Sequence, residues 1–127
     1  MIAVDSSVII PWINGDENPE TKLLADLLAR ADATLAPATL AEILSDPHEG
    51  AAAAEAVAGF ELLDITDGYW GRAGRLRAAL RKAGRKAGVA DALIAQACID
   101  AGAPLLTRDR DFDAMVKLCG LKLYRKA

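Results

Sequence analysis

The fold is decided at the amino terminus, in the ten residues MIAVDSSVII (1–10). Residues 2–4 form a short apolar run that predicts a buried strand, and this run ends in a carboxylate, Asp5. Ser6-Ser7 supplies helix-capping hydroxyls, so a helix is expected to follow until Pro11 interrupts it. The chain therefore begins as strand, acid and helix, with the acid at the carboxyl end of the strand.

Short apolar runs alternate with helical patterns along the rest of the chain. Further strands are expected at 34–36, 62–65, 104–107 and 121–124. Helices are expected from a cap at Asn18 onward, over 39–44, over 48–60, over 89–101 and over 111–118. A further helix is expected from a cap at Thr66 to a break at Gly84, with Trp70, Ala73, Leu76 and Leu80 on its apolar face. This alternation predicts an α/β three-layer sandwich, in which helices cover both faces of a parallel, five-stranded sheet.

The amino-acid composition limits the classes of protein to which the chain can belong. A chain of 127 residues that is 53% hydrophobic and 26% charged is expected to form one globular domain over 1–127. Its longest uncharged stretch, residues 6–15, is too short and too polar to cross a membrane, and no signal peptide is expected in the residues after Met1. Two cysteines, Cys98 and Cys119, are too few for a disulfide framework or a zinc cluster, which favours a reducing cytoplasm.

Acidic residues fall where such a fold places its site. Ligands of open parallel sheets bind outside the carboxyl ends of the strands. Asp5 ends the first strand, Glu42 lies early in the helix after the second strand, and Asp109 and Asp111 follow the fourth strand. Asp91 opens the helix that leads back to the start of that strand, so it is expected at the same edge. Four segments should therefore bring carboxylates to one crevice.

Converging carboxylates repel one another unless a cation lies between them. A set of oxygen ligands without histidine or cysteine is typical of Mg²⁺ or Mn²⁺, and such an ion binds substrate phosphates and activates water. The acids of the crevice are therefore candidates for a site of this kind. Each acid alone has an ordinary explanation as a cap or a solvated turn residue, but their joint occurrence favours a site. The single histidine, His48, is expected at the surface.

The net charge of −3 hides an uneven distribution. Residues 72–86 hold seven basic side chains and no acid, whereas the rest of the chain carries ten more acids than bases. This basic block predicts an electrostatic footprint for phosphates; the alternative is a solvated helix whose long side chains cover its neighbours. The candidate phosphate-binding residues are Arg72, Arg75, Arg77, Arg81, Lys82, Arg85 and Lys86.

Four segments of the chain resemble the motifs of PIN-domain ribonucleases, and the nearest group is the VapC-type toxins of bacterial toxin–antitoxin pairs. The segments are AVDSS (3–7), PATLAEIL (37–44), ADALIA (90–95) and LTRDRDF (106–112). The resemblance spans the whole chain. It implies a five-stranded parallel sheet, a Mg²⁺- or Mn²⁺-dependent endoribonuclease acting on RNA, a homodimer and a cognate antitoxin. It assigns the acidic cluster to Asp5, Glu42, Asp91 and Asp109, with support from Thr107 and Asp111. On this basis we expect Asp5, Asp91 and Asp109 to hold the metal and Glu42 to support it or to orient water. The basic block would then bind RNA, although no motif covers it.

Other interpretations of the pattern fit less well. A receiver-type signalling domain requires adjacent acids after the first strand, where Ser6-Ser7 stands, and a HAD-type phosphatase requires an acid at Ser7. A pure nucleic-acid-binding module has no use for an acidic crevice, and 5% aromatic residues are too few for a base-stacking platform. A catalytically inactive PIN domain and a PIN domain of RNA processing stay open as alternatives.

Overall fold

The computed structural model describes residues 1–125, and its centre is a parallel sheet with the strand order β3-β2-β1-β4. The strands are short: β1 (Ile2–Val4), β2 (Ala33–Leu35), β3 (Glu61–Leu62) and β4 (Leu105–Leu106). Ile2 lies opposite Ala33, and Ala3 lies opposite Leu105. The sheet thus places β1 between β2 and β4, so residues that follow β1 and β4 are neighbours.

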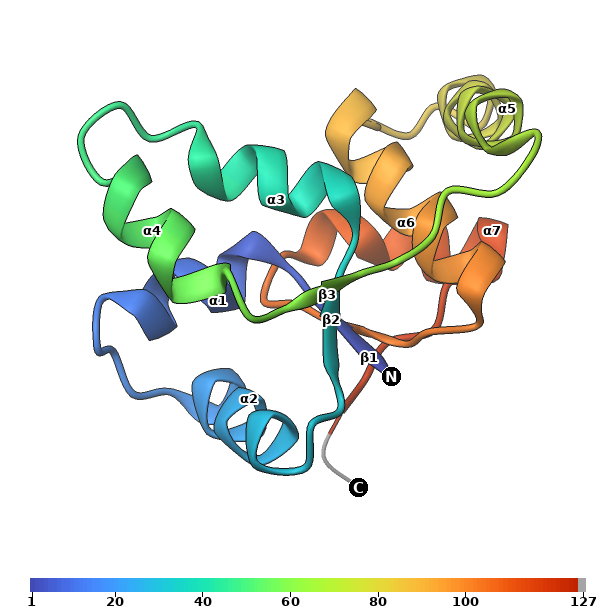
Figure 1. Cartoon of the computed structure of the whole chain (residues 1–127). Coiled ribbons are helices and arrows are strands. Elements are labelled where there is room, and N and C mark those ends of the chain that lie inside the picture. The colour runs from blue at the N-terminus through green and yellow to red at the C-terminus, as the bar shows by residue number, and fades with distance from the viewer. Residues whose placement is uncertain (126–127) are drawn as a thin grey trace.

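Helices cover both faces of the sheet (Figure 1). The helices of the described chain are α1 (Ser6–Ile13), α2 (Pro19–Ala29), α3 (Pro37–Leu44), α4 (Gly50–Val57), α5 (Tyr69–Lys82), α6 (Val89–Ala101) and α7 (Asp113–Cys119), with a 3-10 turn at Arg110–Phe112. In Figure 1, helices α1 to α4 lie to the left of the strands and helices α5 to α7 lie to the right.

Two buried clusters hold these layers together, because successive residues of a strand point to opposite faces of the sheet. Val4 and Leu35 belong to the cluster that α1, α2, α3 and α4 cover. Ala3 and Leu105 belong to the cluster that α5, α6 and α7 cover. The predicted α/β sandwich is therefore confirmed.

The fifth strand is reduced to a single bridge. Residues 121–124 were expected to form a strand, but among the described residues only Leu123 pairs with the sheet, opposite Leu105. Two hydrogen bonds flank this bridge: Leu105 donates its N–H to the carbonyl of Lys122, and Tyr124 donates to the carbonyl of Leu105. The segment runs parallel to β4 without the length of a strand, so the sheet has four strands within residues 1–125.

Helix α1 corrects two expectations. It continues through Pro11 to Ile13, although proline removes one backbone hydrogen bond, because Val8 and Ile9 are fully buried and anchor the helix. Its cap is Asp5, whose side chain accepts the Ser7 N–H at 3.3 Å, and the two serines lie inside the helix. The acid that ends β1 therefore also begins α1.

Helix α5 also departs from the expectation. It begins after Gly68, which adopts the left-handed conformation with φ of 81°, and so the predicted cap at Thr66 is wrong. Its buried side chains are Tyr69, Ala73, Leu76 and Leu80. Trp70 was expected among them but is 67% exposed, because it lies about 100° around the helix from Tyr69.

The other boundaries move by a few residues. Helix α2 begins as expected at a capping box, in which the Asn18 side chain accepts the Thr21 N–H at 2.9 Å and Thr21 accepts the Asn18 N–H. The helix expected over 111–118 divides into the 3-10 turn and α7. His48 is exposed, as expected. Of the helices within residues 1–125, none combines the length and the apolar character needed to cross a membrane.

Candidate active site

A crevice of about 250 Å³ opens at the carboxyl ends of β1 and β4. All four acids of the expected cluster line it: Asp5, Glu42, Asp91 and Asp109. They come from the end of β1, from α3, from the first turn of α6 and from the loop after β4. Asp111 lies beside them, since Asp91, Asp109 and Asp111 each offer a carboxylate oxygen within 4.8 Å of the others. The structure thus brings together acids that are up to 106 positions apart in the chain.

Asp5 is held most firmly. It is 4% exposed, and its N–H donates to the carbonyl of Leu106, so its backbone still belongs to the sheet. Its Oδ2 accepts hydrogen bonds from the Ser7 hydroxyl at 2.6 Å and from the Thr107 hydroxyl at 2.8 Å. Within residues 1–125, no hydrogen bond engages its Oδ1. One carboxylate oxygen is therefore fixed by protein donors, and the other is free for a ligand.

Ser7 and Thr107 also order the loop after β4. The Ser7 Oγ accepts the Arg108 N–H at 3.0 Å, and the Thr107 Oγ1 accepts the Asp109 N–H at 3.0 Å. The two hydroxyl oxygens lie 3.2 Å apart. Asp109 in turn accepts the Asp111 N–H at 2.8 Å and begins the 3-10 turn. This network fixes the positions of Asp5 and Asp109 relative to each other.

Sequence reasoning named Thr107 as a support residue but gave Ser7 no role in the site. The signal was present in AVDSS (3–7), where a hydroxyl follows the acid by two residues. At that spacing, the hydroxyl side chain can hydrogen-bond back to the residue that caps the helix. Ser6 was missed as well: its hydroxyl donates to Glu42 Oε1 at 3.4 Å across 36 positions.

The electrostatics of the crevice favour a cation. Burial, and then the charges of Asp109 and Asp5, raise the pKa of Asp91 from 3.8 to about 6. Burial, and then the charges of Asp5 and Asp91, also raise the pKa of Glu42. Among the described residues, no basic side chain lines the crevice. The carboxylates therefore repel one another, and a positive ion would relieve that repulsion.

The donor set fits a hard divalent cation. Its ligand atoms are carboxylate and hydroxyl oxygens, and neither cysteine nor histidine lines the crevice among the described residues. Mg²⁺ and Mn²⁺ prefer such oxygen ligands. Asp91, Asp109 and Asp111 place carboxylate oxygens close enough to share one ion, and Asp5 and Glu42 line the adjoining crevice.

Two members of the basic block have structural partners. Arg72 forms an ion pair with Asp100, with 2.7 Å between its Nη2 and Oδ2, and its Nε donates to Asp100 Oδ1 at 3.1 Å. The hydrogen bonds from Arg72 hold the pKa of Asp100 below its usual value. The Nε of Arg77 donates to the carbonyl of Ala87 at 2.9 Å. Arg72 thus joins α5 to α6, as the structural interpretation of the block predicts.

The other basic residues of the block are exposed: Arg75, Arg81, Lys82, Arg85 and Lys86. Within residues 1–125 none of them forms an ion pair. A hollow of about 460 Å³ beside the crevice, which sequence reasoning missed, is lined by equal numbers of basic and acidic side chains: Arg108, Arg110, Arg125, Glu20, Asp109 and Asp113. The Nε of Arg108 lies 3.1 Å from Glu20 Oε1, so this arginine is ion-paired. The signal in the sequence was the alternation of arginine and aspartate in residues 108–111.

Solved structures share this fold over nearly the whole chain. VapBC2 from Rickettsia felis, bound to a DNA fragment from its promoter, is 21% identical with a TM-score of 0.76, and each chain is covered completely. VapBC-1 from nontypeable Haemophilus influenzae is 21% identical with a TM-score of 0.73, covering 98% of this chain and 97% of that one. VapBC-5 from Mycobacterium tuberculosis, described as a member of the VapBC family of toxin–antitoxin systems, is 24% identical with a TM-score of 0.69, and 98% of each chain is covered.

A search of curated proteins finds no match to this sequence. The family model of the PIN domain, however, matches residues 2–118. The matched span contains every acid of the crevice and confirms the resemblance seen in the four motifs. The chain belongs to the PIN domain family.

Proposed function

We propose that this protein is a Mg²⁺- or Mn²⁺-dependent endoribonuclease that hydrolyses phosphodiester bonds in RNA. One observation carries the proposal: four carboxylates from four separate segments line one crevice, together with the hydroxyls of Ser6 and Ser7. Membership of the PIN domain family supports a nuclease. The full set of acids argues against the alternative of an inactive PIN domain.

The bound cation would supply positive charge to the scissile phosphate and lower the pKa of water. Asp5, Asp91 and Asp109 would hold it. Glu42 lines the same crevice, and its raised pKa makes it a better proton acceptor than an ordinary carboxylate. We assign it the role of orienting the attacking water and taking its proton. Ser7 and Thr107 keep Asp5 in one orientation, so that the site is formed before RNA arrives.

RNA binding must overcome the repulsion between phosphates and an acidic protein. We assign this task to the exposed members of the basic block and to the partly buried Arg77, each of which would neutralise phosphate charge. The exposed members are Arg75, Arg81, Lys82, Arg85 and Lys86. Arg72 is left out because its guanidinium is engaged by Asp100.

We further propose that the protein is the toxin of a type II toxin–antitoxin pair, acting as a homodimer that a cognate antitoxin inhibits. The support is the likeness in fold to three VapBC structures. Its place of action would be the cytoplasm, in keeping with the free thiols of Cys98 and Cys119. The alternative, a PIN domain of RNA processing, shares the chemistry but predicts that expression is harmless.

The test has two parts. The purified protein should cleave single-stranded RNA in Mg²⁺ or Mn²⁺ and lose this activity in EDTA, and Asp5→Asn should be inactive in either ion. Induced expression in bacteria should arrest growth, and expression of Asp5→Asn should not. Cleavage that survives EDTA would refute the metal-dependent mechanism, and absence of cleavage in either ion would refute the nuclease proposal. Active but harmless protein would refute only the toxin proposal.

A further inference from the structure

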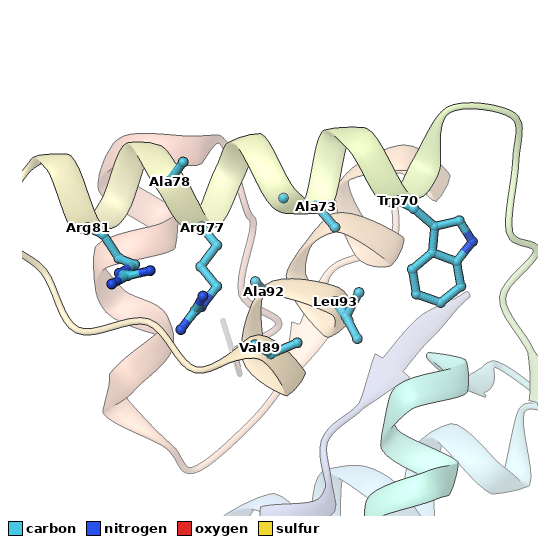
Figure 2. Close-up of a pocket in the computed structure, with 9 residues that line it drawn as sticks. Trp70, Ala73, Arg77, Ala78, Arg81, Val89, Ala92 and Leu93 are labelled. Carbon is cyan, nitrogen blue, oxygen red and sulfur yellow. The ribbon is translucent and has the colours of Figure 1, made fainter.

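A groove of about 390 Å³ lies between α5 and the first turns of α6 (Figure 2). Its larger lining side chains are Trp70, Arg77, Arg81, Val89 and Leu93. Small residues of α5 form the rest of that wall. Among the residues that line it there is no acid, so the groove is positively charged in a protein whose net charge is −3.

Trp70 presents its ring to solvent at one end of the groove. It is 67% exposed, and its ring meets that of Tyr69 edge-on, with centroids 5.0 Å apart. Tyr69 is itself buried and donates its hydroxyl to the carbonyl of Leu93 at 2.6 Å. Most of the indole surface therefore stays open to solvent, where a stacking partner can reach it.

The two arginines occupy the other end of the groove. Figure 2 shows both guanidinium groups directed from α5 toward the space beside Val89. The Nε of Arg77 is fixed by the carbonyl of Ala87, and within residues 1–125 no hydrogen bond engages its two terminal nitrogens. Arg77 and Arg81 are four residues apart on one helix, so they point the same way at a separation of about one turn.

The groove and the acidic crevice share the first turns of α6. Val89, Ala92 and Leu93 line the groove, whereas Asp91, between them in the chain, lines the crevice. Asp91 lies about 200° around α6 from both Val89 and Leu93, so the crevice and the groove lie on opposite sides of that first turn. A strand of RNA whose phosphodiester lies at Asp91 would pass over the start of α6 to bring its neighbouring nucleotides to the groove. Every base offers a flat face to an indole, and successive phosphates offer charge to arginines.

We propose that this groove binds single-stranded RNA, with one base stacked on Trp70 and phosphates held by Arg77 and Arg81. The inference rests on the proposed nuclease function and names the surface that presents the substrate. Stacking on Trp70 is independent of base identity, so the groove would add affinity without selecting a sequence. A second copy of this chain and an acidic peptide are the competing occupants that the test must separate.

The test measures binding of an eight-nucleotide single-stranded RNA in EDTA, where no cleavage occurs. Stacking should quench the fluorescence of Trp70, and Trp70→Ala should weaken binding about 5- to 100-fold. Trp70→Phe keeps an aromatic face and should retain much of the affinity. Arg77→Ala should weaken binding and reduce its salt dependence, whereas Lys22→Ala, which removes one exposed charge on α2, should do neither.

A variant that fills the groove tests whether the effects of these substitutions come from a disturbed fold. Gly74 lines the groove, and a Cβ built there meets nothing within 4 Å. Gly74→Leu should therefore fill the groove while keeping all three side chains and improving the helix. It should lower RNA affinity as Trp70→Ala does, with a melting temperature no lower than that of the wild type.

Four results would overturn the inference. The first two are an RNA affinity unchanged in both Gly74→Leu and Trp70→Ala, and an equal loss of affinity in Lys22→Ala. The third is a change of oligomeric state in Trp70→Ala by sedimentation, which would make the groove a contact between copies of the chain. The fourth is an acidic octapeptide that quenches Trp70 as strongly as RNA does. Failure of the nuclease proposal looks different, because wild-type protein would then bind this RNA but leave it uncut in Mg²⁺.

Discussion

Replacing Asp91 by asparagine should stabilise the metal-free protein. The pKa of Asp91 is raised from 3.8 to about 6, so the folded chain holds this proton more tightly than the unfolded chain does. A difference of that size corresponds to about 3 kcal/mol for a fully shielded group. Because Asp91 is only half-buried, solvent screening leaves roughly half of this value, about 1 to 2 kcal/mol.

The direction of the pKa shift sets the pH range in which the stability difference is seen. A carboxyl whose folded pKa is raised contributes stability that is fully present below its unfolded pKa of 3.8 and is lost as the pH rises through about 6. The raised pKa of Glu42 acts in the same direction. Asp91→Asn should therefore match the wild type near pH 4 and exceed it by about 1 to 2 kcal/mol at pH 7.5.

Urea unfolding in EDTA at several pH values measures this difference. Asp64→Asn, which changes an exposed acid after β3, is the matched control and should show no such pH-dependent gain. Addition of Mn²⁺ should reverse the order at pH 7.5, since ligand binding stabilises only the protein that holds the ion. If Asp91→Asn is less stable than the wild type in EDTA at pH 7.5, the carboxylate serves the fold, and the argument from repulsion is refuted.

Three further changes test other parts of the account. Thr107→Ala removes a donor to the buried Asp5, so unfolding in urea should show a loss of about 1 to 2 kcal/mol and Mn²⁺ affinity should fall, whereas Thr107→Ser should restore both. Arg72→Ala should lower the melting temperature without changing the salt dependence of RNA binding, because this side chain joins α5 to α6. The opposite result is expected when four exposed residues of the basic block are changed to alanine together: Arg81, Lys82, Arg85 and Lys86. The melting temperature should stay unchanged. RNA affinity measured at several salt concentrations should show a slope of log affinity against log salt that is lower by about one to two units.

Much of the fold follows from local pattern. The apolar runs that end in an acid or a proline predict β1 and β2, and the capping residue Asn18 predicts the start of α2. The position of the crevice acids at one edge of the sheet could be predicted from the sequence alone, because the carboxyl ends of parallel strands meet at one edge. Their convergence required only the order of strands and helices, not the details of packing.

What local pattern could not predict depends on tertiary contacts. Pro11 stays within α1 because buried neighbours compensate for the lost hydrogen bond, which no local rule weighs. Trp70 is large and apolar, as core residues usually are, yet the start of α5 at Tyr69 turns its side chain outward. The partnership of Ser7 with Thr107 joins positions 100 residues apart. The pairing of Arg72 with Asp100 is equally invisible in a count of basic residues.

The central claim is that the crevice acids form one site for a divalent cation, and calorimetric titration of the metal-free protein with Mn²⁺ tests it most directly. A saturable binding isotherm is expected at pH 7.5, and Mn²⁺ affinity should fall as the pH drops below about 6, where Asp91 takes up a proton. Asp91→Asn should abolish it, and Asp64→Asn should leave it unchanged. Binding that persists in Asp91→Asn, or its absence in the wild type, would contradict the account.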